Sequence, residues 1–237
     1  MSVGARAVRV GHIEFLNCYP LYYGLERGTH EHALFELVPG VPTDLNRMLA
    51  AGTVDFGPIS SIAYAQNHRL LALSRHLSIS SRGAVDSIQL ICRRPIEELE
   101  SVALTPQSAT SVVLLKTLLR LRYGREVDFV ELRRPVEEQL TLSDAVLLIG
   151  DQGLEAMYFP LRGFRLYDLG TLWHEWTGLP MVYAVWAARV DFLRSRRNDI
   201  LRVESILRGA MDVSLTEEAA LVQSALGRYR FGRSCMT

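Results

Sequence analysis

Short apolar runs and amphipathic stretches alternate along the chain, and this alternation predicts its secondary structure. Over the first eighty residues it predicts strands at Val8–Val10, Ala33–Val38 and Val54–Gly57, and helices at Leu21–Arg27, Thr43–Ala51 and Ile62–Asn67. Strands that alternate with helices at such short spacing favour parallel pairing and right-handed crossovers. The first part of the chain therefore predicts an α/β unit.

A second alternation begins after two extended runs, His76–Ser81 and Val85–Cys92. Its expected strands are Val102–Leu104, Val127–Leu132, Ala145–Ile149 and Phe164–Tyr167. Its expected helices are Ala109–Tyr123, Val136–Leu140 and the segment from Asp151 to Phe159, with Trp173–Gly178 as a helix or loop. Met181–Ala188 is one more apolar strand, and the rest of the chain, from Asp191 to about Gly227, is expected to be helical.

Two alternations that each start afresh predict an α/β protein with two lobes. The first lobe would comprise residues 1–89 and 179–237, and the second, inserted lobe residues 90–178. Two extended hinge strands would join them. Such an arrangement forms a clamshell, whose cleft is built from loops at the strand ends of both lobes.

Composition excludes several classes of protein. The 237 residues include 26 Lys+Arg and 26 Asp+Glu, so no net charge favours nucleic acid or an anionic membrane surface. No stretch approaches ~20 uncharged apolar residues, and Met1–Ala7 does not have the pattern of an export signal, so a cytoplasmic protein is expected. Cys18, Cys92 and Cys235 are far apart and odd in number, which fits a reducing compartment.

The chain has none of the common motifs for metal or cofactor chemistry. His30-Glu31-His32 has the character of a solvated turn, and His174-Glu175 is not followed by the second His of a zinc-protease helix. Neither a Gly-rich phosphate loop nor a Gly-x-Ser-x-Gly elbow occurs. We therefore expect no metal and no cofactor.

The stretch Val8–Pro20 leads from the first strand into the first helix. Pro20 suits the first turn of a helix, where its missing N–H is not needed, and Asn17 lies shortly before it. In an open parallel sheet such turns lie at the carboxyl ends of strands, where ligands bind. Asn17 is therefore a candidate ligand-binding residue, with capping of the helix as the alternative.

Small hydroxyl residues recur at the other predicted strand ends. They are Ser60 and Ser61 after the third strand, Ser81 beside Gly83 at a break, and Ser108, Thr110 and Ser111 at a helix start. Hydroxyl groups and helix N-terminal N–H groups can hold a carboxylate, although Ser and Thr also cap helices in any protein. Together with Asn17, these residues predict an anion-binding cleft.

Three further features have two interpretations each. Asp151 follows a buried strand and would either reach the cleft or cap a helix. Glu14 would act as a general base if desolvation raised its pKa, or lie exposed to solvent. Aromatic residues would form a wall against a flat ring or belong to the core or rim: Trp173, Trp176, Tyr19 and Tyr22.

The motifs resemble those of one known family, in order, over nearly the whole chain. Phe15–Leu21 resembles its Asn-x-x-Pro-Leu signature, and Val54–Ser61 resembles its Val-Asp…Pro-x-Ser-Ser stretch. Ser81–Ser87 matches its Ser-x-Gly-x-Val-x-Ser run, and the pattern continues with Gly150-Asp151, Trp176–Pro180 and Ala184–Trp186. The family is the chorismate dehydratase of the futalosine route of menaquinone biosynthesis, the MqnA family of the MqnA/MqnD superfamily.

The resemblance implies a type II periplasmic-binding-protein-like fold. It implies an enzyme that eliminates water from chorismate, a dicarboxylate, to give 3-(1-carboxyvinyloxy)benzoate without metal or organic cofactor. It also implies functional roles for Asn17 and for one serine of the Ser81–Ser87 run. Ser87 is the favoured serine because it lies where the chain enters the hinge, and Ser81 is the alternative. Arg82 is either a variable position or a substrate ligand.

Two rival functions stay open. The first, 1,4-dihydroxy-6-naphthoate synthase of the same route, would need a general base, often a His, and only His12 or His76 falls near a predicted cleft loop. The second, a non-catalytic small-anion-binding protein of the same fold, would need an export signal. The sequence leaves the oligomeric state open, with a homodimer among the possibilities.

Overall fold

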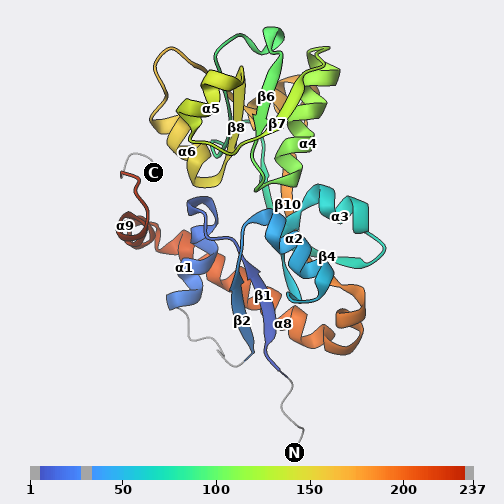
Figure 1. Ribbon diagram of the computed structural model, residues 1–237. Helices are drawn as coiled ribbons and strands as arrows, with labels where there is room; N and C mark the ends of the chain where they lie inside the picture. Colours follow the sequence, from blue (N-terminus) through green and yellow to red (C-terminus); the bar gives the residue numbers. More distant parts are fainter. Residues whose placement is uncertain (1–5, 28–33, 233–237) are drawn as a thin grey trace, which may run out of the picture. The chain divides into compact units, whose positions relative to one another are not determined.

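The structure is a computed structural model that describes residues 6–27 and 34–232 (Figure 1). The chain divides into two compact units, the first made of Met1–Ser78 and Ala184–Thr237 and the second of Ile79–Tyr183. Within the described ranges, every helix is too short or too polar to be a membrane span.

The chain passes between the units inside two long strands. It leaves the first unit within β4 (Leu71–Ser81) and returns within β10 (Met181–Arg189), and these strands are neighbours in one sheet. The second unit, Ile79–Tyr183, extends further at both ends than the predicted inserted lobe of residues 90–178. It includes all of β5 (Ile88–Cys92), which pairs with strands of the second unit on both sides. The cleft between lobes stays a prediction.

The first unit is built on a mixed five-stranded sheet with the order β2-β1-β3-β10-β4. Its first three strands are β1 (Val8–His12), β2 (Phe35–Pro39) and β3 (Phe56–Ser60). β1 pairs in parallel with both β2 and β3, which confirms the predicted parallel pairing, whereas β10 runs antiparallel to β3. The carboxyl ends of β1, β2 and β3 therefore meet at one edge of the sheet.

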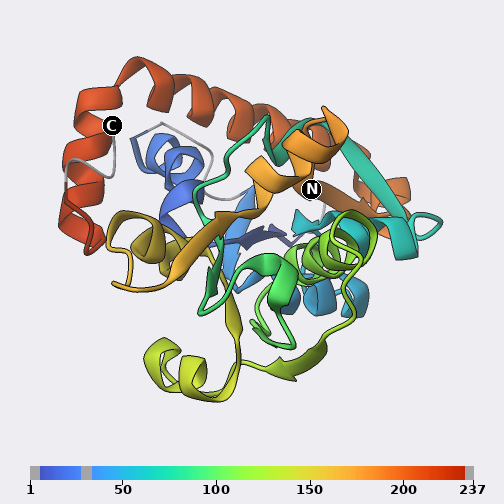
Figure 2. The same ribbon diagram turned by 90° about the horizontal axis from the view of Figure 1, so that it is seen from above.

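The first unit contains a short 3-10 helix and several α-helices. They are the 3-10 helix η1 (Leu16–Cys18), α1 (Tyr19–Arg27), α2 (Pro42–Ala51), α3 (Ser61–Asn67), α8 (Val190–Thr216) and α9 (Glu218–Arg228). The helical character expected from Asp191 to about Gly227 is confirmed, and a break at Glu217, with φ −109° and ψ 33°, divides this part into α8 and α9. Figures 1 and 2 show α8 running past α1, with α9 beyond the break.

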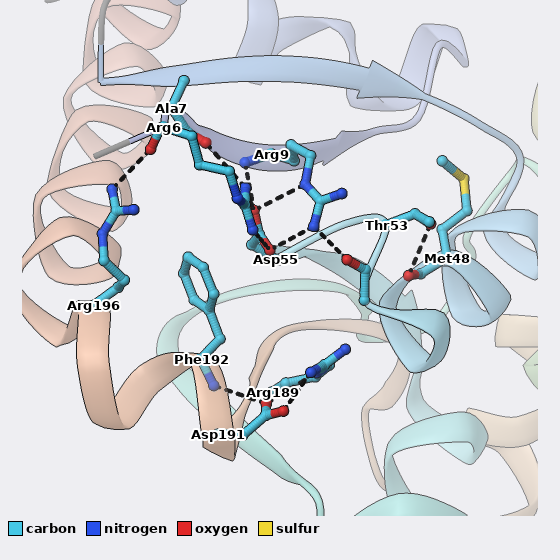
Figure 3. A network of polar contacts seen from close by, with 11 residues as sticks. Arg6, Ala7, Arg9, Met48, Thr53, Asp55, Arg189, Asp191, Phe192 and Arg196 are labelled. Carbon is cyan, nitrogen blue, oxygen red and sulfur yellow. Dashed lines mark hydrogen bonds and ion pairs between the residues drawn. The ribbon is translucent and has the colours of Figure 1, made fainter. Parts of the chain in front are cut away.

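An ion-pair cluster around the buried Asp55 joins the amino ends of β1 and β3 in the first unit (Figure 3). The Asp55 carboxylate accepts hydrogen bonds from Arg6 Nη1 and Nη2 at 2.6 and 2.8 Å. It also accepts them from the backbone N, Nε and Nη2 of Arg9, at 2.9, 3.2 and 2.9 Å. Burial alone raises the pKa of Asp55, but the hydrogen bonds from Arg6 and Arg9 outweigh it and hold this pKa well below its usual range.

The second unit has its own mixed five-stranded sheet, with the order β7-β6-β8-β5-β9. The strands not yet given are β6 (Ser101–Leu104), β7 (Asp128–Glu131), β8 (Ala145–Ile149) and β9 (Arg165–Asp168). β6 is parallel to β7 and β8, while β5 is antiparallel to β8 and β9. Every residue of β5 and β8 is buried, so these strands form the centre of the unit.

Five helical segments surround this second sheet. They are η2 (Ile96–Glu98), α4 (Ala109–Thr117) with the π-helical turn η3 (Leu118–Arg122), α5 (Val136–Leu142), α6 (Gly150–Tyr158) and α7 (Leu169–Thr177). α6 begins directly at the end of β8, and α7 directly at the end of β9. Those two junctions place helix N-termini at the edge of the sheet where the candidate site lies.

Candidate functional site

Asn17 lies in the first unit, just beyond the carboxyl end of β1. It is the middle residue of η1, which passes directly into α1, and its side chain is exposed. The N-cap position of η1 is Phe15, with extended dihedrals of φ −74° and ψ 150°. Phe15, and not Asn17, is thus the N-cap residue of η1, while capping of α1 and ligand binding both stay predictions for Asn17. The turn follows the carboxyl end of β1, and this is the edge where ligands bind in open α/β sheets.

Ser60 and Ser61 lie at the same edge of the same sheet. Ser60 is the last residue of β3 rather than part of an exit loop, and Ser61 begins α3. The Ser60 side chain is buried and bracketed by Asn46 of α2: Asn46 Oδ1 accepts from the Ser60 backbone N at 2.8 Å, and Asn46 Nδ2 donates to Ser60 Oγ at 3.0 Å. Because β1 and β3 are adjacent and parallel, Asn17 and these serines follow neighbouring strand ends.

Glu14 and His12 line a cavity of about 390 Å³ in the first unit, beside α1 and β2. The imidazole of His12 lies 3.8 Å from the ring of Tyr22, centroid to centroid. Burial lowers the pKa of His12, against the opposing effect of nearby Glu14, so the neutral imidazole is favoured at neutral pH. Glu14 itself is exposed, as in its second interpretation.

In the second unit, the strand register brings four segments to one sheet edge. Ile88 of β5 lies opposite Ile149 of β8, so Ser87 is beside the start of α6. Gln89 lies opposite Asp168 of β9, which places the start of α7 at the same edge. β6 is parallel to β8, so its carboxyl end and the start of α4 also lie there. These segments contain Ser87, Ser108, Thr110, Ser111 and Asp151.

Asp168 organises the loop that precedes β5. Its carboxylate accepts hydrogen bonds from the backbone N–H groups of Val85, at 3.1 Å, and Asp86, at 2.7 Å. The Nε2 group of buried Gln89 donates to it at 2.9 Å, and the backbone N of Thr171 donates at 2.8 Å. Asp168 thus caps α7 and at the same time holds the loop of the Ser81–Ser87 run.

The loop contains a strained turn immediately before Ser87. The backbone N of Ser87 donates to the carbonyl O of Val85 at 2.6 Å, and Asp86 between them has a φ of +59°. This is the geometry of a γ-turn with a positive central φ, which is rare and unfavourable for a residue with a side chain. Burial raises the pKa of Asp86, and the neighbouring Asp168 carboxylate raises it further. Ser87 itself is 2% exposed.

Ser81 and Gly83 pack against the start of α7. Ser81 Oγ donates to the carbonyl O of Gly83 at 3.0 Å and lies 3.0 Å from the hydroxyl of Tyr183. Burial raises the pKa of Tyr183 to about 12. Gly170 makes this approach possible, because a Cβ there would lie 2.4 Å from Gly83 O and 2.9 Å from Ser81 Oγ. Contacts with α7 therefore hold both ends of the Ser81–Ser87 run.

The hydroxyl residues of α4 combine capping with burial. Ser108 occupies the N-cap position, its Oγ accepts from the backbone N of Ser111 at 3.2 Å, and it donates to Ser111 Oγ at 2.9 Å. Thr110 and Ser111 are 4% and 1% exposed. Capping by Ser108 is thus confirmed, and ligand binding by this group stays a prediction.

Asp151 and Trp173 belong to the two helices, α6 and α7, that begin at the sheet edge of the second unit. Asp151 is in the first turn of α6, whose N-cap position is Ile149, so Asp151 is not the N-cap residue. A carboxylate in a first helical turn is favoured by the helix dipole. The indole of Trp173, on α7, donates to the carbonyl O of Pro180 at 3.3 Å and packs edge-on against Trp176 at 6.0 Å between ring centroids.

Two features interpreted from the sequence lie outside the described residues, namely the segment His30-Glu31-His32, expected to be a solvated turn, and Cys235. Within the described part of the chain, no three His, Cys, Asp or Glu side chains are grouped closely enough to hold a metal ion.

The sequence pattern does not single out three residues that contact candidate residues within one unit or the other: Asn46, Asp168 and Tyr183. Asp168 had a usable local signal, since an Asp at a strand-to-helix junction is typical of an N-cap. Asn46 lies inside a helix and Tyr183 inside a strand, and no local pattern distinguishes them.

Comparisons with known proteins agree with this architecture. A family model described as menaquinone biosynthesis matches residues 8–236. A chorismate dehydratase of Thermus thermophilus is 37% identical over 174 residues, which are 65% of this chain and 62% of that protein. A chorismate dehydratase of Campylobacter jejuni is 31% identical over 179 residues, which are 73% of this chain and 64% of that protein. The chain therefore spans less than two thirds of the length of these curated relatives.

A solved structure confirms the expected fold. A conserved Candida albicans gene product, which defines a family with the generic periplasmic binding protein fold, superposes with a TM-score of 0.66. The match covers 98% of this chain and 79% of that one at 11% identity. The α/β, periplasmic-binding-protein-like fold predicted for this chain is thus confirmed.

Proposed function

This chain belongs to the menaquinone biosynthesis family, and we propose that within this family it is a chorismate dehydratase. The observation that carries the proposal is the 37% identity to the Thermus thermophilus chorismate dehydratase, within a family match that extends over residues 8–236. The predicted product is 3-(1-carboxyvinyloxy)benzoate.

The proposed reaction is a simple elimination. The ring carbon that bears the enolpyruvyl ether loses its proton, the neighbouring carbon loses its hydroxyl group, and one water is released. The electron pair of the broken C–H bond enters the ring, which becomes aromatic, so the product is strongly favoured. The protein needs to position a dianion, allow one proton to leave and assist departure of the hydroxyl.

In the first unit, we assign Asn17 to the reacting part of the substrate. Its exposed amide at the carboxyl end of β1 can donate to the leaving hydroxyl or to the ring carboxylate. Ser60 and Ser61 at the neighbouring strand end would supply further neutral contacts. The enolpyruvyl carboxylate of chorismate itself would assist the proton transfer.

In the second unit, we assign substrate contacts to the Ser81–Ser87 run, with Ser87 as the favoured residue. Its place after a strained turn supports this assignment, because such strain persists where surrounding contacts hold it and often marks a functional site. The helix starts that carry Ser108–Ser111 and Asp151 are at the same sheet edge. Neutral hydroxyls and helix N-termini can hold carboxylates without cationic side chains.

Incubation of the purified protein with chorismate tests the proposal. We expect a new aromatic product in liquid chromatography with mass detection, at the mass of chorismate less one water. Asn17→Ala should lower kcat/KM by about a hundredfold, the usual effect of removing one transition-state donor. Asn67→Ala is a matched control, since Asn67 is an exposed helical Asn that donates to Ala63 O in α3. It should keep wild-type activity.

The outcomes separate the rival functions. Tight binding of chorismate without turnover would favour the anion-binding protein of the same fold. Neither binding nor turnover would contradict a role with chorismate and direct attention to 1,4-dihydroxy-6-naphthoate synthase. Full activity of Asn17→Ala would contradict the assignment of Asn17 but leave the dehydratase proposal standing.

A further inference from the structure

The last two helices of the chain hold the segment that carries Asn17. η1 passes directly into α1, so the position of Asn17 depends on the position of α1. α1 packs on α8 in backbone contact: a Cβ on Gly24 would lie only 1.9 Å from the carbonyl O of Ala210. In addition, buried Ser214 of α8 donates to the carbonyl O of Pro20. The first turn of α1 is therefore fixed to α8.

Two hydrogen bonds from the α9 region bracket the Asn17 turn on both sides. On the far side, the Tyr19 hydroxyl lies 2.7 Å from Ser224 Oγ of α9. On the near side, the Tyr229 hydroxyl, just after α9, donates to the carbonyl O of Glu14 at 3.2 Å. Asn17 is three residues after Glu14 and two before Tyr19. Both contacts join positions about 200 residues apart in the sequence, 205 for Tyr19 and 215 for Glu14.

A small apolar cluster supports the same turn. Tyr19, Tyr23 and Ala225 are buried together, and Leu16, the neighbour of Asn17, packs against them. The ring of Tyr229 meets that of Tyr19 at 5.5 Å between centroids and 60° between planes. The guanidinium of Arg228 lies 5.1 Å above the Tyr19 ring and pairs with Glu26 at 2.7 Å. Residues on both sides of Asn17 thus contact α9 or the residue that follows it.

We propose that α9 and Tyr229 position the Asn17 turn, and that Ser224 and Tyr229 are positioning residues for the proposed dehydration. The inference rests on the proposed function for its catalytic consequence, but its structural part is independent of the substrate. An exposed amide that must meet a reacting group needs a rigid backbone, because a misplacement of about 1 Å can cost about a hundredfold in rate. Here the rigidity comes from the far end of the chain.

Tyr229→Phe and Ser224→Ala test this inference, each by removing one bracketing hydrogen bond. We expect faster amide hydrogen exchange in residues 14–19 of both variants, since exchange reports local opening. We expect kcat for chorismate to fall by about tenfold with KM nearly unchanged, the pattern of a contact made in the transition state. Ser224→Ala keeps the test decisive if Tyr229→Phe folds poorly.

Tyr167→Phe is the matched control. It removes a phenol hydroxyl whose oxygen accepts a hydrogen bond from the backbone N of Ile96 at 3.3 Å, in the second unit. It removes a tyrosine hydrogen bond as Tyr229→Phe does, yet should leave exchange in residues 14–19 and kcat unchanged. Unaltered exchange in Tyr229→Phe and Ser224→Ala, or an equal loss of kcat in Tyr167→Phe, would overturn the inference. If exchange in residues 14–19 is faster in the two variants but the wild type does not turn over chorismate, the structural role of α9 is upheld and the proposed function is rejected.

Discussion

Asp55 in the first unit and Asp168 in the second both use one carboxylate to tie together segments distant in sequence, but they have different donors. Asp55 is bound by the charged guanidinium groups of Arg6 and Arg9 (Figure 3). Asp168 is bound by neutral groups, namely backbone N–H groups and the amide of Gln89. Asp55 precedes β3, at the amino edge of its sheet, whereas Asp168 ends β9, at the edge where the candidate site lies.

These different donors indicate different roles, stabilisation of the fold for Asp55 and positioning of the Ser81–Ser87 run for Asp168. Two cationic partners stabilise the ionised form of Asp55 and hold the start of two strands together. The donors of Asp168 include the N–H groups of Val85 and Asp86, within a turn that has a positive φ. Removing Asp55 should therefore mainly affect folding, and removing Asp168 should mainly affect the geometry of the Ser81–Ser87 run.

The largest expected effect on stability is that of Asp55→Asn. It leaves Arg9 and Arg6 without their ionic partner, and since these two side chains are 25% and 50% exposed, water partly replaces the lost partner and the cost should be about 2 kcal/mol. We expect the free energy of unfolding in urea to fall by about that amount, with kcat/KM unchanged for the molecules that remain folded. A loss of activity at full stability would contradict the assignment of Asp55 to folding.

Asp168→Asn should have the opposite profile. The substituted amide cannot accept all the hydrogen bonds that the carboxylate accepts, so the γ-turn before Ser87 relaxes. We expect kcat/KM for chorismate to fall by about a hundredfold, while the lost N-cap of α7 lowers stability by about 1 kcal/mol. Asp191→Asn is the control, because Asp191 also lies at the start of a helix but belongs to the first unit, where it pairs with Arg189. An equal loss of activity in Asp168→Asn and Asp191→Asn would contradict the positioning role of Asp168.

The smallest effect should be seen in the pH dependence of stability. The folded-state pKa of Asp55 lies below its unfolded value of about 3.9, so its stabilising contribution is complete above that pH. As the pH falls below about 4, the unfolded chain takes up the proton first, and the contribution is lost progressively toward the folded pKa. The free energy of unfolding in urea can be measured between about pH 2 and 7. Toward acid pH it should fall less steeply in Asp55→Asn than in the wild type. The same pH dependence in the variant and the wild type would contradict the ionised state of Asp55.

The sequence predicted much of the local structure because the signals are short-range. The order of strands and helices, the parallel pairing of β1 with β2 and β3, and the start of α4 at Ser108 all follow from periodicity, turn residues and caps. The errors also have physical causes. The third strand was expected at Val54–Gly57, but β3 spans Phe56–Ser60 and includes Pro58, which is unusual in a central strand and lies opposite Trp186 in the antiparallel pair with β10. Pairing across the sheet overrode the local preference.

The site shows the same division between local and distant determinants. Asn17, Ser87 and the hydroxyl residues were singled out from residue type and position alone. The 3-10 helix around Asn17 could not be predicted in the same way, because the start of α1 depends on how α1 packs against α8 and α9. Likewise, no pattern near Ser60 reveals the amide of Asn46, which reaches it from α2.

The sequence by itself determined the α/β class, the succession of elements and the residue types at the strand ends. These depend on propensity, periodicity and capping, which act over a few residues. Only the tertiary structure decided which side chains hold those strand ends in place. Asp168 contacts Val85 across 83 positions, and Tyr229 contacts Glu14 across 215. Hydrogen bonds over such separations depend on how whole elements pack, and no short stretch of the chain contains that information.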